Sequence, residues 1–273
     1  MRLRSLLFVP GDRPDRFAKA AASGADAIIL DLEDSVAVSA KPRARGEVAA
    51  YLASPAEVRR FVRINPVDSG TLDADLDAAR GADGLVLPKA EGVRTLETLG
   101  QDLPPVLPVA TETPAAIFAL GEYVRSPVAL AGLTWGAEDL PAAIGAATSR
   151  EPDGRYTPPY ELARSLMLFA AHAAGVPAIE TVYPAIKDEA GLAAYAARGL
   201  RDGFTGMMAI HPAQVAVINA AFTPDEAALA HARAVVAAFD ANPGAGALQL
   251  DGRMIDLPHL KQARRVLALA GKG

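Results

Sequence analysis

The chain has 273 residues, of which 51% are hydrophobic and 5% aromatic, and its formal net charge is -5. This length and hydrophobic content can supply a large core, whereas the mild charge argues against general binding of nucleic acid or membrane surfaces. The absence of cysteine excludes thiol catalysis, disulfides and thiolate zinc sites. An anionic substrate would therefore need local Arg or Lys side chains.

The amino-terminal segment has two arginines before an apolar run at residues 6–9. This run is too short for a signal peptide, and no small-residue cleavage pattern follows it. No apolar stretch elsewhere reaches the roughly 18 residues that a membrane span requires. We therefore expect a cytoplasmic protein without membrane contact.

Short apolar runs alternate with segments of helical periodicity along most of the chain. The eight apolar runs are residues 6–9, 27–30, 61–64, 84–87, 106–109, 128–131, 178–179 and 206–209. The helical segments include residues 13–22, 43–52, 72–80, 113–123, 161–174 and 188–201. Apolar strands that are each followed by a helix indicate a parallel sheet covered by helices, and eight such units predict a (β/α)8 TIM barrel. An open doubly wound sheet is the alternative, although no G-x-G-x-x-G follows the first strand.

The residues after the eighth predicted strand exceed what a barrel needs. The chain continues through residues 212–221, and a helix is then predicted to run to about residue 240, with Thr223 as N-cap, Pro224 in the first helical position and Glu226 completing a capping box. A polar segment and a last helix follow. We expect a barrel domain of residues 1–222 and a C-terminal helical extension of residues 223–273, which could cover its own barrel mouth or a neighbour's.

Charged or turn residues follow nearly every predicted strand, at the end where barrel enzymes carry their chemistry. Such groups are costly to desolvate unless they pair or bind a ligand, so we expect a polar site at this end. The residues in chain order are Gly11, Asp12 and Arg13, then Asp31, Glu33 and Asp34, then Arg63, Asn65, Lys89, Glu112, Asp139, Glu180 and His211.

Glu112 and Asp139 are the candidate metal ligands. Both are oxygen donors with no His or Cys nearby in sequence, which favours a hard cation such as Mg²⁺, with Mn²⁺ as an alternative, over zinc. The competing interpretation is that each acid caps the helix that follows it. Two acids at strand ends that face one cavity favour the shared metal.

Arg63 interrupts an apolar strand, so its permanent charge must meet an anion. That anion is either a substrate group or an acid of the cluster formed by Asp31, Glu33 and Asp34. The cluster could hydrogen-bond to metal-bound waters or to Arg63 itself. We therefore take Arg63 and Glu33 as candidate catalytic residues, and Arg63 also as a candidate substrate ligand.

The basic residues near the predicted mouth suit a phosphorylated ligand. Gly11 in a turn with Arg13 at a helix start is typical of phosphate binding, and Lys41 belongs to a basic cluster that suits a polyphosphate tail, although solvated helix faces explain the cluster equally well. Lys89 could act as a Schiff-base nucleophile, but an ion pair with a neighbouring acid is the favoured interpretation. His211 is interpreted as a turn residue that could close over a ligand.

Seven motifs in the same order resemble the citrate lyase beta-subunit-like family. They are RSLLFVPGDRP at residues 4–14, ILDLED at 29–34, VRIN at 62–65, LPKAE at 87–91, WGAEDL at 135–140, IHPAQ at 210–214 and GRMID at 252–256. The family belongs with the malyl-CoA and citramalyl-CoA lyases of the HpcH/HpaI superfamily and, more distantly, with class II hydroxy-oxo-acid aldolases. The resemblance implies a barrel, usually trimeric, that cleaves a β-hydroxyacyl thioester with Mg²⁺.

The resemblance assigns roles to motif positions. It implies that Glu112 and Asp139 bind the metal, that Arg63 and Glu112 bind substrate, and that Asp256 is an acid/base that reaches an adjacent subunit's site. Two departures, Pro114 after Thr113 and Trp135 where many members have Phe, leave the acyl pocket and the substrate open.

The expected reaction is cleavage of a 3-hydroxy-3-carboxyacyl-CoA thioester, of the citramalyl-CoA or malyl-CoA type, to acetyl-CoA and a 2-oxo acid. In it Gly11, Arg13 and Lys41 would hold the CoA tail, and the protein would be a homo-oligomer. The alternatives are a citryl-acyl-carrier-protein lyase beta subunit that works in a complex, a class II hydroxy-oxo-acid aldolase, and a non-catalytic acyl-CoA-binding module.

Overall fold

A parallel sheet of eight strands forms the centre of the computed structural model, which describes residues 2–270. The strands are β1 (Ser5–Pro10), β2 (Ala27–Asp31), β3 (Arg59–Arg63), β4 (Gly84–Leu87), β5 (Val106–Pro108), β6 (Leu133–Thr134), β7 (Ala178–Glu180) and β8 (Gly206–Ala209). Their order in the sheet is β5-β4-β3-β2-β1-β8-β7-β6. Strand β1 therefore pairs with both β2 and β8, which brings the first and last units of the predicted barrel together.

The two outer strands of this order, β5 and β6, also meet. Val109 forms a parallel bridge to Thr134, and the Ala110 N–H donates to the Thr134 carbonyl at 2.9 Å. Val106 exchanges backbone hydrogen bonds with Ala129 and Ala131, both at 2.8 Å. These contacts close the sheet into a barrel, so the predicted (β/α)8 fold is confirmed and the open sheet is wrong.

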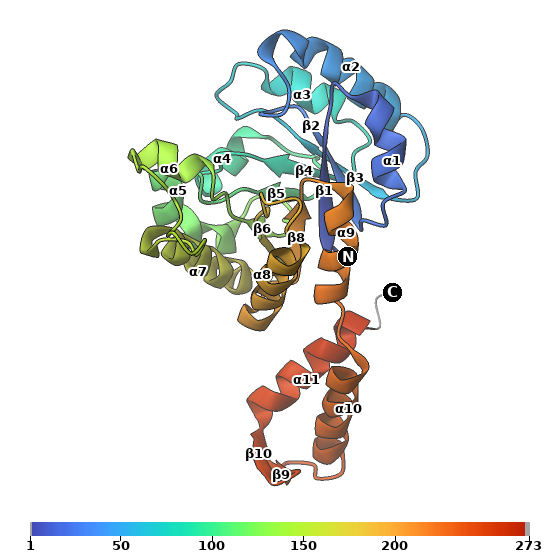
Figure 1. Ribbon diagram of the computed structural model, residues 1–273, viewed down its shortest axis with the longest axis vertical. Coiled ribbons are helices and arrows are strands. Elements are labelled where there is room, and N and C mark those ends of the chain that lie inside the picture. The colour runs from blue at the N-terminus through green and yellow to red at the C-terminus, as the bar shows by residue number, and fades with distance from the viewer. Residues whose placement is uncertain (1, 271–273) are drawn as a thin grey trace. The chain divides into compact units, whose positions relative to one another are not determined.

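Helices follow the strands and surround them (Figure 1). Those of the barrel are α1 (Phe17–Ala21), α2 (Lys41–Leu52), α3 (Leu72–Ala78), α4 (Val93–Thr98), α5 (Pro114–Ala119), α6 (Asp139–Ile144), α7 (Pro158–Ala173), α8 (Glu189–Asp202) and α9 (Pro212–Ala221), with short 3-10 helices at η1 (Pro14–Arg16), η2 (Val38–Ala40) and η3 (Leu120–Arg125). The predicted helical segments all contain helix, although residues 13–22 and 113–123 each divide into an α-helix and a 3-10 helix.

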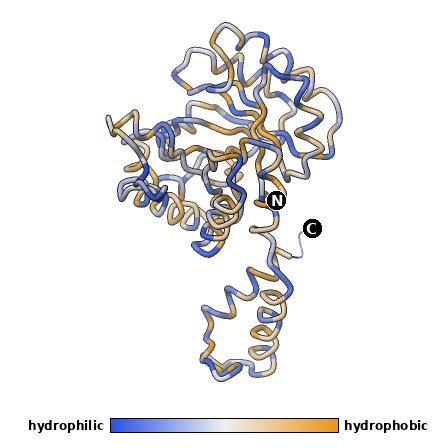
Figure 2. Tube along the Cα trace, in the orientation of Figure 1, coloured by the Kyte–Doolittle hydropathy of each residue, from blue (hydrophilic) through white to orange (hydrophobic). Residues whose placement is uncertain are grey.

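Apolar side chains from the strands fill the inside of the barrel. The buried cluster includes Leu6, Ile29, Phe61, Val86, Leu107, Ile179 and Met208, and Figure 2 shows the hydrophobic residues concentrated along the strands. Gly84 is required by this packing, because a Cβ there would lie 2.3 Å from the Phe61 ring. A packed interior leaves the strand ends as the place for polar chemistry.

The sixth strand was predicted at residues 128–131, and this boundary is wrong. The structure places β6 at Leu133–Thr134, while Leu130 forms only an isolated bridge to Val106. The chain between them passes Gly132, where a Cβ would lie 2.7 Å from the Pro177 carbonyl. The close approach of two backbones therefore moves the regular pairing two residues beyond the most apolar segment.

The chain forms two compact units, one of residues Leu3–Asn219 and one of the remaining described residues. The second unit contains helix α10 (Glu226–Asp240), a hairpin of β9 (Ala247–Leu250) and β10 (Arg253–Asp256), and helix α11 (Leu257–Ala270). Val235, Phe239 and Leu260 belong to its own small core. The hairpin was not predicted, although Asp251 and Gly252, both at positive φ, form the turn that favours one.

The N-cap of α10 is Asp225, which corrects the predicted Thr223. The Asp225 side chain accepts a hydrogen bond from the Ala228 N–H at 2.7 Å. A carboxylate is at least as good an N-cap as a threonine hydroxyl, and the helix consequently begins later, at Glu226.

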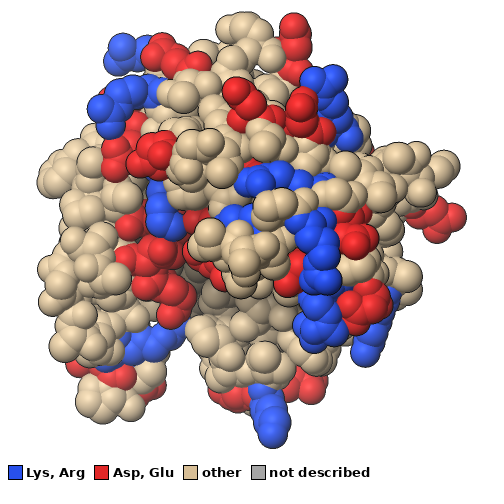
Figure 3. Space-filling model, turned by 90° about the horizontal axis from the view of Figure 1, so that it is seen from above, with Lys and Arg blue, Asp and Glu red and all other residues tan. Residues whose placement is uncertain are grey.

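On the face seen in Figure 3, acidic and basic side chains are mixed around a recess.

Candidate active site

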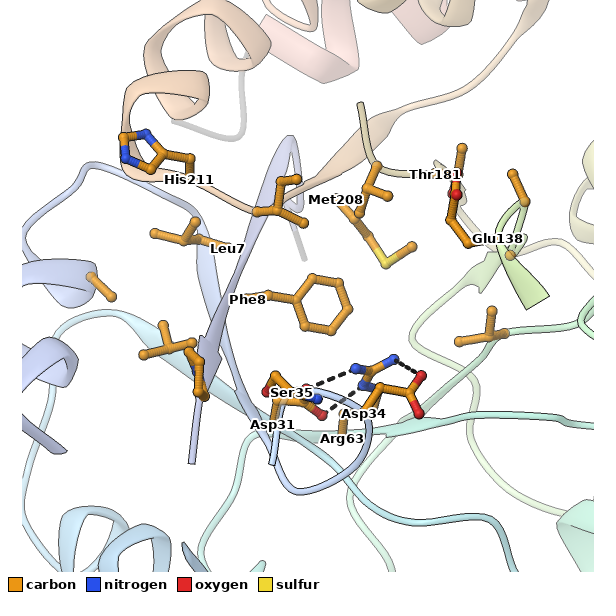
Figure 4. Close-up of a pocket in the computed structure, with 18 of the residues that line it drawn as sticks. Leu7, Phe8, Asp31, Asp34, Ser35, Arg63, Glu138, Thr181, Met208 and His211 are labelled. Carbon is orange, nitrogen blue, oxygen red and sulfur yellow. Dashed lines mark hydrogen bonds and ion pairs between the residues drawn. The ribbon is translucent and has the colours of Figure 1, made fainter. Parts of the chain in front are cut away.

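A cavity of about 780 Å³ lies at the C-terminal ends of the strands. It is lined by apolar groups that include Phe8 and Met208, and by six of the residues predicted at the strand ends, which are Asp31, Asp34, Arg63, Glu112, Asp139 and His211. Figure 4 shows Arg63 beside Asp31 and Asp34, beneath the ring of Phe8. The structure therefore brings the central predicted residues to one cavity.

Arg63 is held from two sides. Its Nε and Nη2 each donate to the buried carboxylate of Asp31 at 2.7 Å, and its guanidinium lies 4.8 Å from the centre of the Phe8 ring. Burial raises the pKa of Asp31, but the pairing with Arg63 and the hydrogen bond from Ser35 outweigh it, so the pKa stays below its ordinary value. Arg63 is thus a cation that is fixed in position and lines the cavity.

Glu33 connects Arg63 to Lys89. Glu33 is buried, its Oε2 lies 2.8 Å from Nη1 of Arg63 in an ion pair without hydrogen-bond alignment, and its Oε1 accepts from the Lys89 ammonium at 2.7 Å. The Lys89 ammonium also lies 3.4 Å from Asp139. Burial lowers the pKa of Lys89, but Glu33 and the nearby acids raise it above its ordinary value. The predicted ion pair of Lys89 is therefore present, and a charged ammonium is a poor Schiff-base nucleophile.

Glu112 is buried at the wall of the cavity, with 4% of its surface exposed. Its Oε2 accepts a 2.6 Å hydrogen bond from the Lys89 backbone N–H. Burial, together with the negative charges of Asp139 and Glu33, raises the pKa of Glu112 to about 8. The ionised form of Glu112 is therefore disfavoured in this position. A cation bound beside it would stabilise the ionised form and lower the pKa.

Gly136 makes room for Glu112. A Cβ on Gly136 would lie 2.5 Å from Cγ and 2.9 Å from Oε1 of Glu112. The Gly136 N–H also donates to the Thr111 hydroxyl at 3.1 Å, which ties the loop carrying Asp139 to the loop carrying Glu112. Sequence reasoning did not predict this role, because the contact joins residues that are 24 positions apart or more.

The charges of the site fit one divalent cation. Six carboxylates, of Asp31, Glu33, Asp34, Glu112, Glu138 and Asp139, and four cations, of Arg16, Lys19, Arg63 and Lys89, leave a net charge of -2 when all are ionised. No group of three or more His, Asp or Glu side chains is arranged as a metal site within residues 2–270. Two carboxylate ligands with the remaining positions open to water or substrate are typical of Mg²⁺.

Glu180, which was expected at the same mouth, faces away from the cavity into the protein. It is fully buried, and it accepts hydrogen bonds from Trp135 Nε1 at 2.5 Å, from Arg164 at 2.8 Å and from Tyr195 at 3.0 Å. Arg164 is also paired with Asp202 at 2.8 Å. This cluster is a structural support beneath the loop that begins at Trp135.

The three predicted ligands of the CoA tail have partners within the protein. Gly11 is buried against the Asp31 carbonyl, which a Cβ would approach to 2.6 Å, and Arg13 pairs with Asp15 at 2.8 Å. The Lys41 ammonium donates to the Leu32 and Glu33 carbonyls, at 2.8 and 2.9 Å, and to Asn65. These bonds use the three ammonium donors of Lys41, so it holds the loop after β2.

Arg16, Lys19 and His211 line the cavity although only His211 was considered from the sequence. Arg16 and Lys19 are exposed, and neither side chain forms a hydrogen bond or an ion pair of 4 Å or less within the described residues. Their spacing of three positions at the start of the first helical segment is the sequence signal, because such residues lie on one helix face. The Nδ1 of His211 accepts from the Ala213 N–H at 3.2 Å, as a turn residue does.

Asp256 lies in the second unit, where it ends β10 and immediately precedes α11. Its carboxylate lies 2.5 Å from Nδ1 of His259, and it accepts from the His259 N–H at 3.4 Å. The hydrogen bond with His259 lowers the pKa of Asp256. Asp256 therefore caps a helix in this chain and presents a carboxylate that is 35% exposed.

A charged cavity at the C-terminal mouth of a (β/α)8 barrel defines the class of TIM-barrel enzymes. The chain belongs to the HpcH/HpaI aldolase/citrate lyase family, whose sequence model matches residues 4–212. Members of this family include lyases, so the family expected from the seven motifs is confirmed. Among residues 2–270 we find no helix with the length and apolar character that a bilayer crossing requires.

Relatives match the chain over nearly its full length. A citrate lyase subunit beta-like protein of Mycobacterium tuberculosis is 39% identical over 269 residues, which are 97% of this chain and 95% of that protein. A (3S)-malyl-CoA thioesterase of Cereibacter sphaeroides is 35% identical over 278 residues, covering 98% and 94% of the two chains. The crystal structure of M. tuberculosis CitE in complex with magnesium, acetoacetate and coenzyme A has a TM-score of 0.85 at 37% identity and covers 99% of each chain.

Proposed function

We propose that the protein is a Mg²⁺-dependent carbon-carbon lyase that cleaves a 3-hydroxy-3-carboxyacyl-CoA thioester to acetyl-CoA and a 2-oxo acid. The observation that carries this proposal is the convergence of Glu112, Asp139 and Arg63 on one cavity whose lining charges, together with those of Glu33 and Lys89, sum to -2. The M. tuberculosis structure with magnesium and coenzyme A supports both the metal and the carrier. Substrates of the citramalyl-CoA or malyl-CoA type have the required hydroxyl and carboxylate groups.

Glu112 and Asp139 would hold the Mg²⁺, with Mn²⁺ as an alternative. When bound, the metal supplies Lewis-acid chemistry to the hydroxyl and carboxylate oxygens of the substrate. Arg63 binds the oxygen that becomes the carbonyl of the 2-oxo acid, and its fixed charge stabilises the negative charge that develops there. Asp31 and Glu33 keep Arg63 in this orientation through their ion pairs.

The cleavage step moves one electron pair and one proton. A carboxylate accepts the proton of the substrate hydroxyl, the hydroxyl oxygen forms the new carbonyl, and the bond to the acetyl carbon breaks so that its electron pair becomes the acetyl-CoA enolate. A carboxylic acid then donates a proton to that enolate. We assign this donation to Asp256 of a neighbouring subunit in a homo-oligomer, with a trimer as the expected form.

The CoA tail would lie along the cavity wall that carries Arg16 and Lys19. Both are exposed cations without an ion-pair partner within the described residues, and such groups suit phosphate oxygens. Gly11, Arg13 and Lys41 then shape the adjacent loops through the contacts described above. The acyl-CoA substrate makes the cytoplasm the expected location.

The test is a set of three substrates, citramalyl-CoA, malyl-CoA and citryl-CoA, each incubated with the purified protein and Mg²⁺. Release of acetyl-CoA with an equal amount of the 2-oxo acid is the expected result for at least one of them. Release of free CoA with an intact hydroxy acid would instead establish thioester hydrolysis, the second candidate, which the Cereibacter relative favours. Inactivity on all three CoA esters with activity on a citryl-acyl-carrier protein would establish the subunit alternative.

A separate experiment tests whether Asp256 of one subunit acts in the active site of its neighbour. Mixed oligomers of Asp256→Ala and Glu112→Ala protomers, each inactive alone, should regain part of the wild-type rate, because some sites then combine an intact Glu112 with an intact Asp256. Mixtures that stay inactive, in oligomers shown to contain both variants, would contradict the assignment of Asp256 to a neighbour's site.

A further inference from the structure

Alternating charges form a continuous chain of ion pairs along the cavity wall and behind it. Asp31 pairs with Arg63, Arg63 with Glu33, Glu33 with Lys89, and Lys89 with Asp139, at distances between 2.7 and 3.4 Å. The chain of charges runs from Asp31, through the arginine proposed to bind the substrate oxygen, to an acid proposed to bind the metal. Glu33 and Lys89 occupy its middle, and neither lines the cavity.

The backbone of Lys89 makes a second contact with the same site. Lys89 has a φ of 49°, a left-handed conformation that is unusual for a residue with a Cβ. In this conformation its N–H donates to Glu112 at 2.6 Å, while its ammonium reaches Glu33 and Asp139. One residue therefore contacts both proposed metal ligands through different groups, and unusual backbone conformations of this kind cluster at functional sites.

We infer that Lys89 is a positioning residue that, through Glu33, couples the metal ligand Asp139 to the substrate-binding Arg63. The inference rests on the proposed function and goes beyond it, because it assigns a role to a pair of residues that contact neither metal nor substrate. Lys89 shares the charge of Glu33 with Arg63. When Lys89 is removed, Glu33 is left to Arg63 alone, and the guanidinium has less positive charge to offer an anion.

Removal of the ammonium has opposite consequences at the two ends of the chain. Asp139 loses a competing cation 3.4 Å away, so a divalent metal should bind more tightly. Arg63 is neutralised more fully by Glu33, so a 2-oxo acid should bind more weakly. For ion pairs that are about one-third exposed, as Lys89 and Asp139 are, each effect should be about fivefold in Kd, which corresponds to about 1 kcal/mol.

The experiment measures binding and needs no turnover. Isothermal titration calorimetry gives the Kd of Mg²⁺ for the oligomer without substrate, and then the Kd of glyoxylate or pyruvate at saturating Mg²⁺. Lys89→Met removes the ammonium but keeps a side chain of similar length and the backbone N–H. Because methionine also has a Cβ, the cost of the unusual φ is the same as in the wild type. Lys187→Met is the matched control, because Lys187 is an exposed lysine of the same unit outside the cavity.

A double-mutant cycle with Glu33→Gln separates coupling from a simple change of local charge. If Lys89 acts on Arg63 through Glu33, Lys89→Met weakens 2-oxo acid binding about fivefold in the wild type and has no effect in the Glu33→Gln background. An equal loss in both backgrounds would overturn the inference, because a direct field effect does not need Glu33. The tighter Mg²⁺ binding should persist in both backgrounds, since Lys89 contacts Asp139 directly.

Three further results complete the test. Lys89→Arg should restore wild-type 2-oxo acid binding if its charge is what matters, and a failure to do so, with Mg²⁺ binding intact, would count against the role. If Lys89→Met weakens the binding of both Mg²⁺ and the 2-oxo acid, the cause is structural damage to the site, and the inference is overturned. A wild-type protein that binds neither Mg²⁺ nor a 2-oxo acid would overturn the proposed function itself, and the inference with it.

Discussion

Replacing Gly136 by Ala should damage the site through Glu112 alone. The Gly136 backbone lies outside the left-handed region, so alanine can adopt it without strain, but the new Cβ would lie 2.5 Å from Glu112 Cγ and 3.1 Å from Cδ. Ordinary carbon contacts are about 3.5–4 Å, so Glu112 must move by about 1 Å. Overpacking of this size costs about 1–3 kcal/mol.

This cost should appear in the affinity for the metal. If Glu112 moves aside, its ligand geometry is lost, and 1–3 kcal/mol corresponds to a Mg²⁺ Kd that is raised about 5- to 150-fold. Titration calorimetry with Mg²⁺ measures the affinity, and the thermal midpoint without metal shows whether the fold survives. A Gly136→Ala protein that binds Mg²⁺ with wild-type affinity would refute the argument.

Gly46→Ala is the matched control for this substitution. Gly46 lies in the middle of α2 (Lys41–Leu52), and a Cβ there would have no heavy atom within 4 Å. The same chemical change should therefore stabilise the protein by about 0.5–1 kcal/mol, because alanine favours the helix. The Mg²⁺ affinity should not change.

Three other predictions concern stability, pH and the proposed CoA tail. Glu180→Ala should lower the free energy of unfolding by about 3–5 kcal/mol, because it leaves the buried Arg164 without its closest partner; chemical denaturation measures this, and a loss below 1 kcal/mol would be inconsistent with it. Asp31→Asn should have a lower free energy of unfolding than the wild type at pH 7, because a carboxyl whose pKa is lowered by folding stabilises the protein only while it is ionised. The difference in the free energy of unfolding should close as the pH falls below about 4. A difference that is unchanged at acid pH would contradict this. Arg16→Ala and Lys19→Ala should each raise the KM for the acyl-CoA and leave kcat unchanged, since both line the cavity wall but neither is paired with Arg63, Glu112 or Asp139. An unchanged KM would remove them from the tail site.

Most of the fold was predictable because the sequence repeats one physical unit. Apolar strands of four residues or so can be buried on both faces only in a parallel sheet, and helical segments between them leave few topologies. The error in the sixth strand arose because the most apolar residues of that segment are not the residues that pair regularly in the sheet. Residues 128–131 are apolar and buried in part, but the close passage of Gly132 by Pro177 shifts the regular pairing to Leu133 and Thr134.

The site was predictable to the extent that it depends on strand ends. Arg63, Glu112 and Asp139 each follow or end a predicted strand, so the closed barrel necessarily gathers them. The positive φ of Lys89 and the room that Gly136 leaves for Glu112 depend on contacts between distant segments. The contacts of Lys41 could not be predicted for the same reason, because only the folded loop brings the Leu32 and Glu33 carbonyls to its ammonium.

The measurement that tests the central claim most directly is cleavage of citramalyl-CoA and malyl-CoA by the wild type and Glu112→Ala, with Mg²⁺ and with excess EDTA. We expect acetyl-CoA and a 2-oxo acid in equal amounts from the wild type with Mg²⁺ and none in EDTA. Glu112→Ala should remain folded, bind no Mg²⁺ and release no acetyl-CoA. Full cleavage in EDTA, or by Glu112→Ala, would contradict a metal-dependent lyase at this site.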